Sequence, residues 1–186
     1  MPPIRRRTRE VWSVLYERQQ QAIERVAYAQ FSTSLGQLGM SPHAIPEFSQ
    51  LNKRLESLTG WTIYAVSGLI PNTQFFQLML FRRLGLQPGF GKKSQLDYLE
   101  EPDMFHDIFG TSPCSRDARV ANYLLELAYI ADRYTDKEEI IEQIARLYWY
   151  TIEFGVVRDL SLNIFNPSDA YFFTFMSSLI KAYPFE

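Results

Sequence analysis

The sequence is poor in cysteine and histidine. Its 186 residues include one cysteine, Cys114, and two histidines, His43 and His106. A lone cysteine excludes an internal disulfide and is typical of proteins in a reducing compartment, so we expect a cytoplasmic protein. The whole chain therefore has only two imidazole side chains that could bind a metal.

The sequence also lacks an excess of either charge and any long apolar run. Lys and Arg number 19 against 21 Asp and Glu, for a formal net charge of -2. The chain therefore lacks the excess of positive charge that is typical of proteins that bind nucleic acid or an acidic membrane surface. The basic cluster at residues 5–9 is interpreted as a solvated chain end. No apolar run reaches the roughly 18 residues of a membrane span, and no signal-peptide pattern follows the basic N-terminus. We expect no nucleic-acid partner and no membrane association.

Apolar and aromatic residues, in contrast, are abundant. They make up 46% and 15% of the chain, enough to fill the core of one domain spanning residues 1–186. Apolar residues recur at helical spacing in several segments, and one aromatic, β-branched segment is typical of a strand. The predicted helices cover residues 8–35, 46–60, 72–80, 115–132 and 138–155, the predicted strand covers 61–66, and a loop is predicted between Gly85 and Leu99. The buried sides of the last two long helices are expected to be Val120, Leu124, Leu127, Ala128 and Ala131 in one and Ile140, Ile141, Ile144, Leu147 and Ile152 in the other. The fold class is therefore expected to be mainly α (α+β), with a few short strands.

Residues 101–111 read Glu-Pro-Asp-Met-Phe-His-Asp-Ile-Phe-Gly-Thr. Pro102 is a favourable helix start and Gly110 a favourable helix stop. The pattern predicts a short helix between them that carries His106.

A second segment, residues 147–155, places Glu153 in an apolar helix end beside Ile152 and Phe154. An isolated carboxylate is costly to bury, so Glu153 needs a partner. A metal held jointly with His106 is the partner that this sequence suggests. A capping box at residues 135–138 is predicted to start the helix that carries Glu153.

These two segments closely resemble the pterin-dependent aromatic amino acid hydroxylases of bacteria. The resemblance is carried by residues 95–110 and 145–155, and residues 8–19 extend it almost to the N-terminus. It implies the helical catalytic domain of that family and a monooxygenase activity. In the family, two histidines and one glutamate hold a non-haem Fe(II) and leave positions open for oxygen and water. The resemblance implies His106 and Glu153 as two of these catalytic metal ligands.

The resemblance also implies a site for tetrahydropterin. Gly68, Leu69 and Ile70 would supply backbone contacts, and Phe75 would supply the ring that stacks on the pterin. Asp107 matches the acidic residue of the family near the pterin. For Phe75 the alternative is an ordinary core residue.

The substrate implied by the resemblance is a small aromatic molecule that reacts with molecular oxygen. Pro102 and Trp149 match positions that line the substrate pocket, although Trp149 could equally be an aromatic core residue. The family has an arginine that pairs bidentately with the substrate carboxylate, a geometry that lysine cannot reproduce. Lys92 or Lys93 stands near that position, and a solvated loop charge is the alternative for both.

The sequence departs from the family at one metal ligand. The second histidine of the motif is replaced by Thr111, whose neutral hydroxyl is a poor ligand for Fe(II). Water, Asp107, Asp103 or Cys114 could fill the position instead. His43 lies where the family has no ligand, and we expect it to be exposed.

A further departure follows residue 156. The Tyr-Gly-Ala-Gly run that closes the active site in the family is missing, and residues 169–179 look like a later family segment. We therefore expect an internal deletion that removes one wall of the substrate pocket.

Two functions follow from the resemblance. One is a divergent iron monooxygenase with an altered metal site and an altered aromatic substrate. The other is a hydroxylase-like protein that has lost catalysis and acts as a binding or partner protein. The oligomeric state is left open by the sequence.

Overall fold

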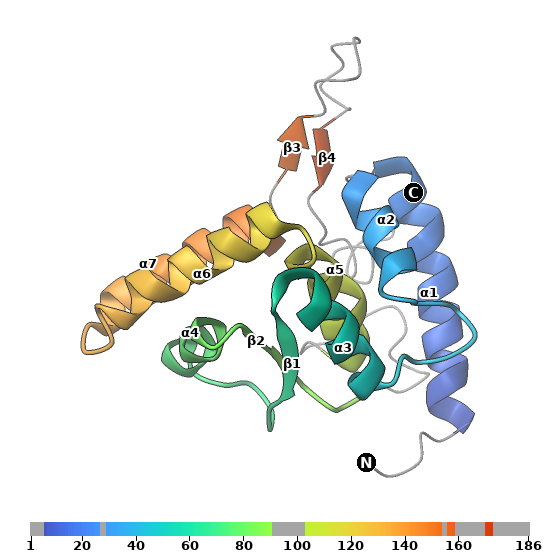
Figure 1. Ribbon diagram of the computed structural model, residues 1–186, viewed down its shortest axis with the longest axis horizontal. Coiled ribbons are helices and arrows are strands. Elements are labelled where there is room, and N and C mark those ends of the chain that lie inside the picture. Colours follow the sequence, from blue (N-terminus) through green and yellow to red (C-terminus); the bar gives the residue numbers. More distant parts are fainter. Residues whose placement is uncertain (1–5, 27–28, 91–102, 154–155, 159–169, 173–186) are drawn as a thin grey trace.

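The fold is predominantly helical and contains two short two-stranded sheets (Figure 1). The computed structural model describes residues 6–26, 29–90, 103–153, 156–158 and 170–172. The elements in chain order are α1 (Arg6–Val26), α2 (Ala29–Gln37), α3 (Phe48–Thr59), β1 (Thr62–Ala65), α4 (Asn72–Leu80), β2 (Arg83–Leu86), the π-helical turn η2 (His106–Thr111), α5 (Ser112–Ser115), α6 (Ala118–Asp132), α7 (Glu138–Tyr148), the π-helical turn η3 (Trp149–Glu153), β3 (Val156–Arg158) and β4 (Ala170–Phe172). The predicted fold class is confirmed.

The aromatic face of α1 anchors the turn that follows α2. The indole Nε1 of Trp12 donates a hydrogen bond to the carbonyl oxygen of Ser41 at 2.8 Å, and the Tyr16 hydroxyl donates one to the carbonyl oxygen of Met40 at 3.2 Å. Both rings are buried. Buried polar atoms of this kind need such partners, so these contacts fix the chain path from α2 toward α3.

The second predicted helix is α3, which ends where the sequence indicated. Gly60 adopts the left-handed conformation at φ 77°, and its N–H donates to the Glu56 carbonyl oxygen. Glycine reaches this conformation without a steric penalty. Asn52 of α3 bonds both backbone polar groups of Ile63 in β1, donating at 3.1 Å and accepting at 2.7 Å. Its amide therefore pairs with β1 much as a neighbouring strand would.

Strands β1 and β2 are parallel, and α4 forms the crossover between them (Figure 1). Thr62 pairs with Arg83 and Ala65 with Leu86. β1 was predicted from the sequence, but the loop predicted from Gly85 onward was wrong for Gly85 and Leu86, which belong to β2. The strand is short and follows α4 almost directly, so no turn signal or alternating pattern marks it.

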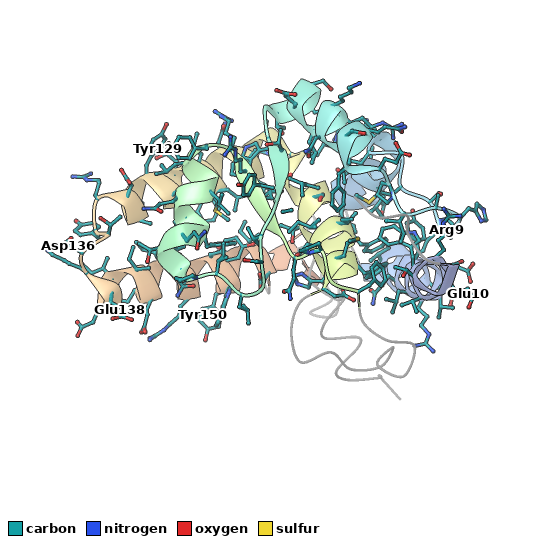
Figure 2. The ribbon with its side chains drawn as sticks, turned by 90° about the horizontal axis from the view of Figure 1, so that it is seen from below. Arg9, Glu10, Tyr129, Asp136, Glu138 and Tyr150 are labelled. Carbon is teal, nitrogen blue, oxygen red and sulfur yellow. The ribbon has the colours of Figure 1, made fainter. Side chains whose placement is uncertain are left out.

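Helices α6 and α7 form an antiparallel hairpin against which α4 packs (Figure 1). The predicted inward side of α6 is confirmed, because its members are all buried: Val120, Leu124, Leu127, Ala128 and Ala131. The charged residues Asp136 and Glu138 lie at the tip of the hairpin (Figure 2). The hairpin therefore covers one side of the β1–α4–β2 unit and presents its polar end to solvent.

The predicted capping box before α7 was wrong. The N-cap of α7 is Lys137, which makes no side-chain capping hydrogen bond, and Thr135 lies two residues earlier in the turn that ends α6. Leu147 was also expected on the buried side of this helix, but 47% of its surface is exposed and the neighbouring Tyr148 is buried instead.

Among the described helices, none combines the length and the apolar character needed to cross a membrane.

The start of α6 provides a test of the fold. The Asp117 carboxylate accepts a hydrogen bond from the Arg119 backbone N–H at 2.9 Å as the helix N-cap. We expect Asp117→Ala to lower the free energy of unfolding by about 1 kcal/mol. Asp117→Asn should lower it by less, because asparagine also caps helices well. Urea denaturation of the three proteins measures this. Equal losses in both variants would show that the capping hydrogen bond is not the stabilising contact.

Candidate metal and cofactor site

One cavity collects most of the residues that the sequence singled out. It has a volume of about 430 Å³ and lies among α4, β2, η2 and the α7–η3 helix. Its lining comprises Val66, Gly68, Leu69, Ile70, Asn72, Phe75, Met79, Leu84, Gly85, Gln87, His106, Asp107, Thr111, Ala145, Tyr148, Trp149 and Glu153. Its size is that of a small-molecule site, roughly 300–1,000 Å³.

The histidine segment is a π-helical turn. The sequence predicted a helix that stops at Gly110, which was wrong, because η2 includes Gly110 and continues into α5. A π-turn inserts an extra residue into helical geometry and is frequent at functional sites. Here it places His106 and Thr111, five residues apart, on the wall of the same cavity.

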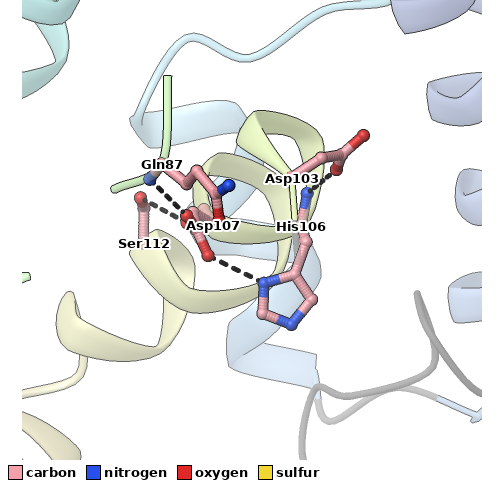
Figure 3. A network of polar contacts seen from close by, with 5 residues as sticks. All are labelled: Gln87, Asp103, His106, Asp107 and Ser112. Carbon is pink, nitrogen blue, oxygen red and sulfur yellow. Dashed lines mark hydrogen bonds and ion pairs between the residues drawn. The ribbon is translucent and has the colours of Figure 1, made fainter. Parts of the chain in front are cut away.

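Asp107 holds the imidazole of His106 (Figure 3). The Nδ1 atom of His106 lies 2.8 Å from Oδ1 of Asp107, and the backbone N–H of Gln87 donates to Oδ2 at 2.8 Å. Both carboxylate oxygens of Asp107 are therefore engaged. A carboxylate on one ring nitrogen fixes the histidine tautomer and leaves the other nitrogen, Nε2, as the atom suited to bind a metal.

Two further contacts hold the backbone of η2 (Figure 3). The buried carboxylate of Asp103 accepts a hydrogen bond from the His106 backbone N–H at 3.0 Å. The Ser112 hydroxyl donates to the carbonyl oxygen of Asp107 at 3.3 Å. Asp103 thus acts at the start of the turn and is not part of the cavity lining.

Glu153 ends the second π-turn, η3, and lines the same cavity. The Thr151 hydroxyl satisfies the Leu147 carbonyl oxygen at 2.6 Å and lies 3.0 Å from the Tyr123 hydroxyl of α6. These bonds tie the turn to α6. Glu153 and His106 therefore face one space from separate and well-anchored helices.

Burial raises the pKa of the Glu153 carboxyl above its ordinary value. The positive charge of His106 opposes this rise, and the negative charge of Asp107 adds to it. A nearby cation stabilises the ionised form of a carboxylate that is shielded from water. The environment of Glu153 would therefore favour a cation beside its carboxylate.

This pKa leads to a prediction for the metal-free protein. We expect Glu153→Gln to raise its stability at neutral pH, because glutamine removes the cost of ionising a shielded carboxyl. The folded-state pKa of Glu153 is raised, so the unfolded chain loses its proton first, and stability declines as the pH rises from the ordinary value of 4.5 through the folded value. Below this pH range Glu153 is protonated in both the folded and the unfolded chain, so the greater stability of the glutamine variant should vanish there. Thermal unfolding of both proteins at acidic and at neutral pH measures this difference in stability. A Glu153→Gln variant less stable than the unmodified chain at neutral pH would contradict the prediction.

Four of the predicted pterin contacts lie on α4 or the loop before it, whereas the fifth, Asp107, lies on η2. Gly68, at φ 76°, Leu69 and Ile70 all line the cavity. Phe75 also lines it, and the ring centroid of Phe75 lies 5.1 Å from that of the buried Tyr148. Phe75 is only partly buried, so it joins the core on one side and faces the cavity on the other.

The predicted substrate contacts are placed only in part. Trp149 lines the cavity, and 52% of its surface is exposed, which rules out the interpretation as a core residue. Pro102, Lys92 and Lys93 lie outside the described residues.

A third protein ligand is not found in the described part of the chain. No group of three His, Cys, Asp or Glu side chains there could hold a metal ion. Thr111 stands at the cavity wall in the position of the missing histidine, and His43 is exposed, as expected, and is not among the lining residues. The side chain of Cys114 lies outside the described residues. Of the predicted metal ligands, His106 and Glu153 line the same cavity, and the described donors do not complete a triad.

Sequence reasoning missed two lining residues that matter to the site. Gln87 lies in a loop, as predicted, but the hydrogen bond that its backbone N–H donates to Asp107 was not foreseen. Tyr148 is buried against Phe75. No local pattern marks Gln87, whereas the helical spacing of four between Ile144 and Tyr148 could have placed Tyr148 on the inner face of α7.

Comparison with known proteins identifies the family of this chain. The family model described as biopterin-dependent aromatic amino acid hydroxylase matches residues 4–179. Phenylalanine-4-hydroxylase of Caulobacter vibrioides is 39% identical over 148 residues, which are 80% of this chain and 50% of the relative. The Chromobacterium violaceum enzyme is 40% identical over 147 residues, 78% of this chain and 49% of the relative. The chain thus spans about half the length of these curated relatives.

Solved structures resemble the fold over nearly its whole length. Chromobacterium violaceum phenylalanine hydroxylase with bound iron(III) and oxidised 7,8-dihydrobiopterin gives a TM-score of 0.84 at 31% identity, covering 97% of this chain and 62% of that one. The same enzyme bound to cobalt gives 0.83 at 32% identity, covering 95% and 60%.

Proposed function

Because the chain belongs to the biopterin-dependent aromatic amino acid hydroxylases, we propose that it is a divergent non-haem iron monooxygenase. Its cavity would bind Fe(II), tetrahydropterin and a small aromatic substrate other than free phenylalanine. Molecular oxygen is the co-substrate.

One observation carries this proposal. The residues that the family resemblance assigned to the metal and to the pterin come from segments far apart in the chain, and all of them line a single cavity: His106, Glu153, Gly68, Leu69, Ile70, Phe75 and Asp107. A relative of the same fold contains iron and a biopterin in its crystal structure.

The described side chains have distinct tasks in this proposal. His106, held by Asp107, and the shielded carboxylate of Glu153 would bind the iron, which when bound supplies the oxygen chemistry that no side chain here provides. Phe75 presents a ring on which a flat pterin can stack, and the buried Tyr148 supports that ring. Trp149 gives the aromatic substrate an apolar wall and shields it from water.

A second function is favoured by Thr111 and by the absence of a third ligand among the described residues. A protein with this cavity could bind a pterin or an aromatic compound without catalysis. In that case the chain would serve as a binding or partner protein of the hydroxylase family.

Oxygen consumption separates the two functions. The protein, loaded anaerobically with Fe(II), is mixed with tetrahydropterin and a panel of aromatic compounds, and oxygen uptake is followed together with product formation. We expect at least one compound to give a hydroxylated product, with little or none from phenylalanine, and we expect Glu153→Gln to abolish the reaction. If the unmodified chain binds pterin but takes up no more oxygen than Glu153→Gln, the non-catalytic binding function is favoured instead.

A further inference from the structure

The outer edge of strand β2 is directed away from its partner strand. Within the described part of the chain, β1 pairs with β2 in parallel and on one side only. The backbone N–H of Val66 donates to the Leu86 carbonyl oxygen at 2.8 Å, so Leu86 points toward β1. Neighbouring residues of a strand direct their backbone N–H and C=O groups to opposite sides of it. The backbone groups of Gly85 and the N–H of Gln87 therefore lie on the outer edge.

This outer edge lies at the cavity. The Gln87 N–H donates to the Asp107 carboxylate of η2 at 2.8 Å, which places η2 on the outer side of β2 (Figure 3). Gly85, Gln87 and Asp107 all line the cavity. Among the residues that the structure describes, none forms a hydrogen bond with the N–H or the C=O of Gly85. Gly85 thus offers a ligand one backbone donor and one backbone acceptor, side by side.

A donor and an acceptor in this arrangement suit an extended peptide-like ligand. An open strand edge is a template for a second extended chain. A residue of an antiparallel chain presents its own N–H and C=O side by side, and it can exchange both hydrogen bonds with Gly85. In this mode of recognition the main-chain bonds contribute affinity, and a nearby pocket selects the side chain. We therefore expect a ligand that has an amide on each side of one residue.

The cavity beside Gly85 favours an aromatic side chain on that residue. Phe75 and Trp149 both line the cavity. The ring of the buried Tyr148 packs against Phe75, with the ring centroids 5.1 Å apart, and so supports this wall. Aromatic rings pack well against one another in offset or edge-to-face arrangements. The walls therefore suit a flat aromatic group.

Charge favours an amide over a free carboxylate in the ligand. Asp107 and Glu153 are both acidic, and both line the cavity. A third carboxylate in the same space would be repelled by both of them, whereas an amide is neutral. We propose that the aromatic ligand of this cavity is an aromatic residue with an amide on each side, as in a peptide, held by the backbone of Gly85. This inference rests on the proposed function, because it names the substrate class of the same cavity.

Ligand binding by the metal-free full-length chain tests the inference, measured by isothermal titration calorimetry. The probes are the N-acetyl amides of phenylalanine and tryptophan. The matched control for each is its ester analogue, in which an oxygen atom replaces the N–H and the shape is kept. We expect at least one amide to bind more tightly than the corresponding free amino acid. Its ester should bind about fivefold to tenfold more weakly, because the ester cannot donate to the Gly85 carbonyl oxygen. Equal affinity of amide and ester would overturn the inference.

Gly85→Pro removes the donor on the protein side. Proline has no N–H, and a sheet tolerates it on an edge strand where the N–H faces outward. We expect this variant to bind the amide about fivefold or more weakly than the unmodified chain. Gly85→Ala is the matched control, because it keeps the N–H. Its added Cβ would lie 3.6 Å from Leu78 Cδ1 and from Val66 Cγ1, an ordinary contact. Equal affinities of the two variants for the amide would overturn the inference.

Two further measurements accompany the variants. Thermal unfolding shows whether Gly85→Pro folds, and the comparison of amide with ester uses the unmodified chain and does not depend on it. Tetrahydropterin is titrated into the same proteins, because a flat heterocycle could also use the donor and acceptor of Gly85. If Gly85→Pro weakens the binding of tetrahydropterin and not that of the amide, the edge serves the pterin and the inference is overturned.

The outcomes distinguish this inference from the proposed function. Oxygen uptake with tetrahydropterin and another aromatic compound, with no binding of either amide, would overturn the inference alone. Amide binding that shows the expected ester and proline effects, with no oxygen uptake by the Fe(II)-loaded chain on any compound, would support the inference and overturn the monooxygenase function.

Discussion

Thr111→His should tighten the binding of Fe(II) by about 10 to 100-fold or more, the largest effect that we expect from a single substitution at the site. Thr111 and His106 lie at the two ends of η2 on the same cavity wall, so a histidine at 111 restores the second imidazole of the family motif. Imidazole is a far better ligand for Fe(II) than a neutral hydroxyl.

Anaerobic competition with a coloured Fe(II) chelator measures this affinity. Thr111→Val is the matched control, because it keeps the shape of threonine and removes only the hydroxyl. We expect valine to leave the affinity nearly unchanged, since the hydroxyl contributes little as a ligand. Equal Fe(II) affinity in the histidine variant and in the unmodified chain would show that residue 111 does not face the metal.

Phe105→Ala should lower the free energy of unfolding by about 3–5 kcal/mol, the largest effect that we expect on stability. Phe105 is fully buried. Its ring stacks on Phe109 with centroids 4.9 Å apart and meets the edge of Trp12 at 5.2 Å. Alanine would remove these contacts and leave a cavity between α1 and the segment that leads into η2.

The matched control for this substitution is an exposed phenylalanine. Phe81 has 72% of its surface exposed, and the Arg83 guanidinium lies 5.9 Å from its ring centroid. We expect Phe81→Ala to cost less than about 1 kcal/mol, because an exposed cation–π contact contributes about 0.5–1 kcal/mol. Urea denaturation compares the two variants. Similar losses in both would mean that the aromatic cluster around Phe105 does not stabilise the fold.

Sequence periodicity located the helices because each of them buries one face. The inner side of α6, from Val120 to Ala131, follows the helical repeat closely, and of its buried residues only Ala121 was not predicted. The two π-turns were not predicted. A π-turn differs from an α-helix by one residue in its hydrogen-bonding pattern, and neither the run from His106 to Thr111 nor that from Trp149 to Glu153 carries a composition that marks it.

The site was predicted by family resemblance and not by spacing. His106 and Glu153 are 47 positions apart, and no local pattern could bring them to one cavity. A helix stop at Gly110 was expected from propensity, but the packing of η2 against its neighbours overrides the tendency of glycine to end a helix. The role of Gln87 depends on the pairing of β2 with β1, a long-range contact that the local sequence does not encode.

The account depends on one shared cation between His106 and Glu153, and iron analysis tests it most directly. The purified chain is loaded anaerobically with Fe(II), freed of loosely bound metal and assayed for iron beside His106→Ala. We predict stoichiometric iron in the unmodified chain and a large loss in the variant. Substoichiometric iron that is unchanged by His106→Ala would contradict the account.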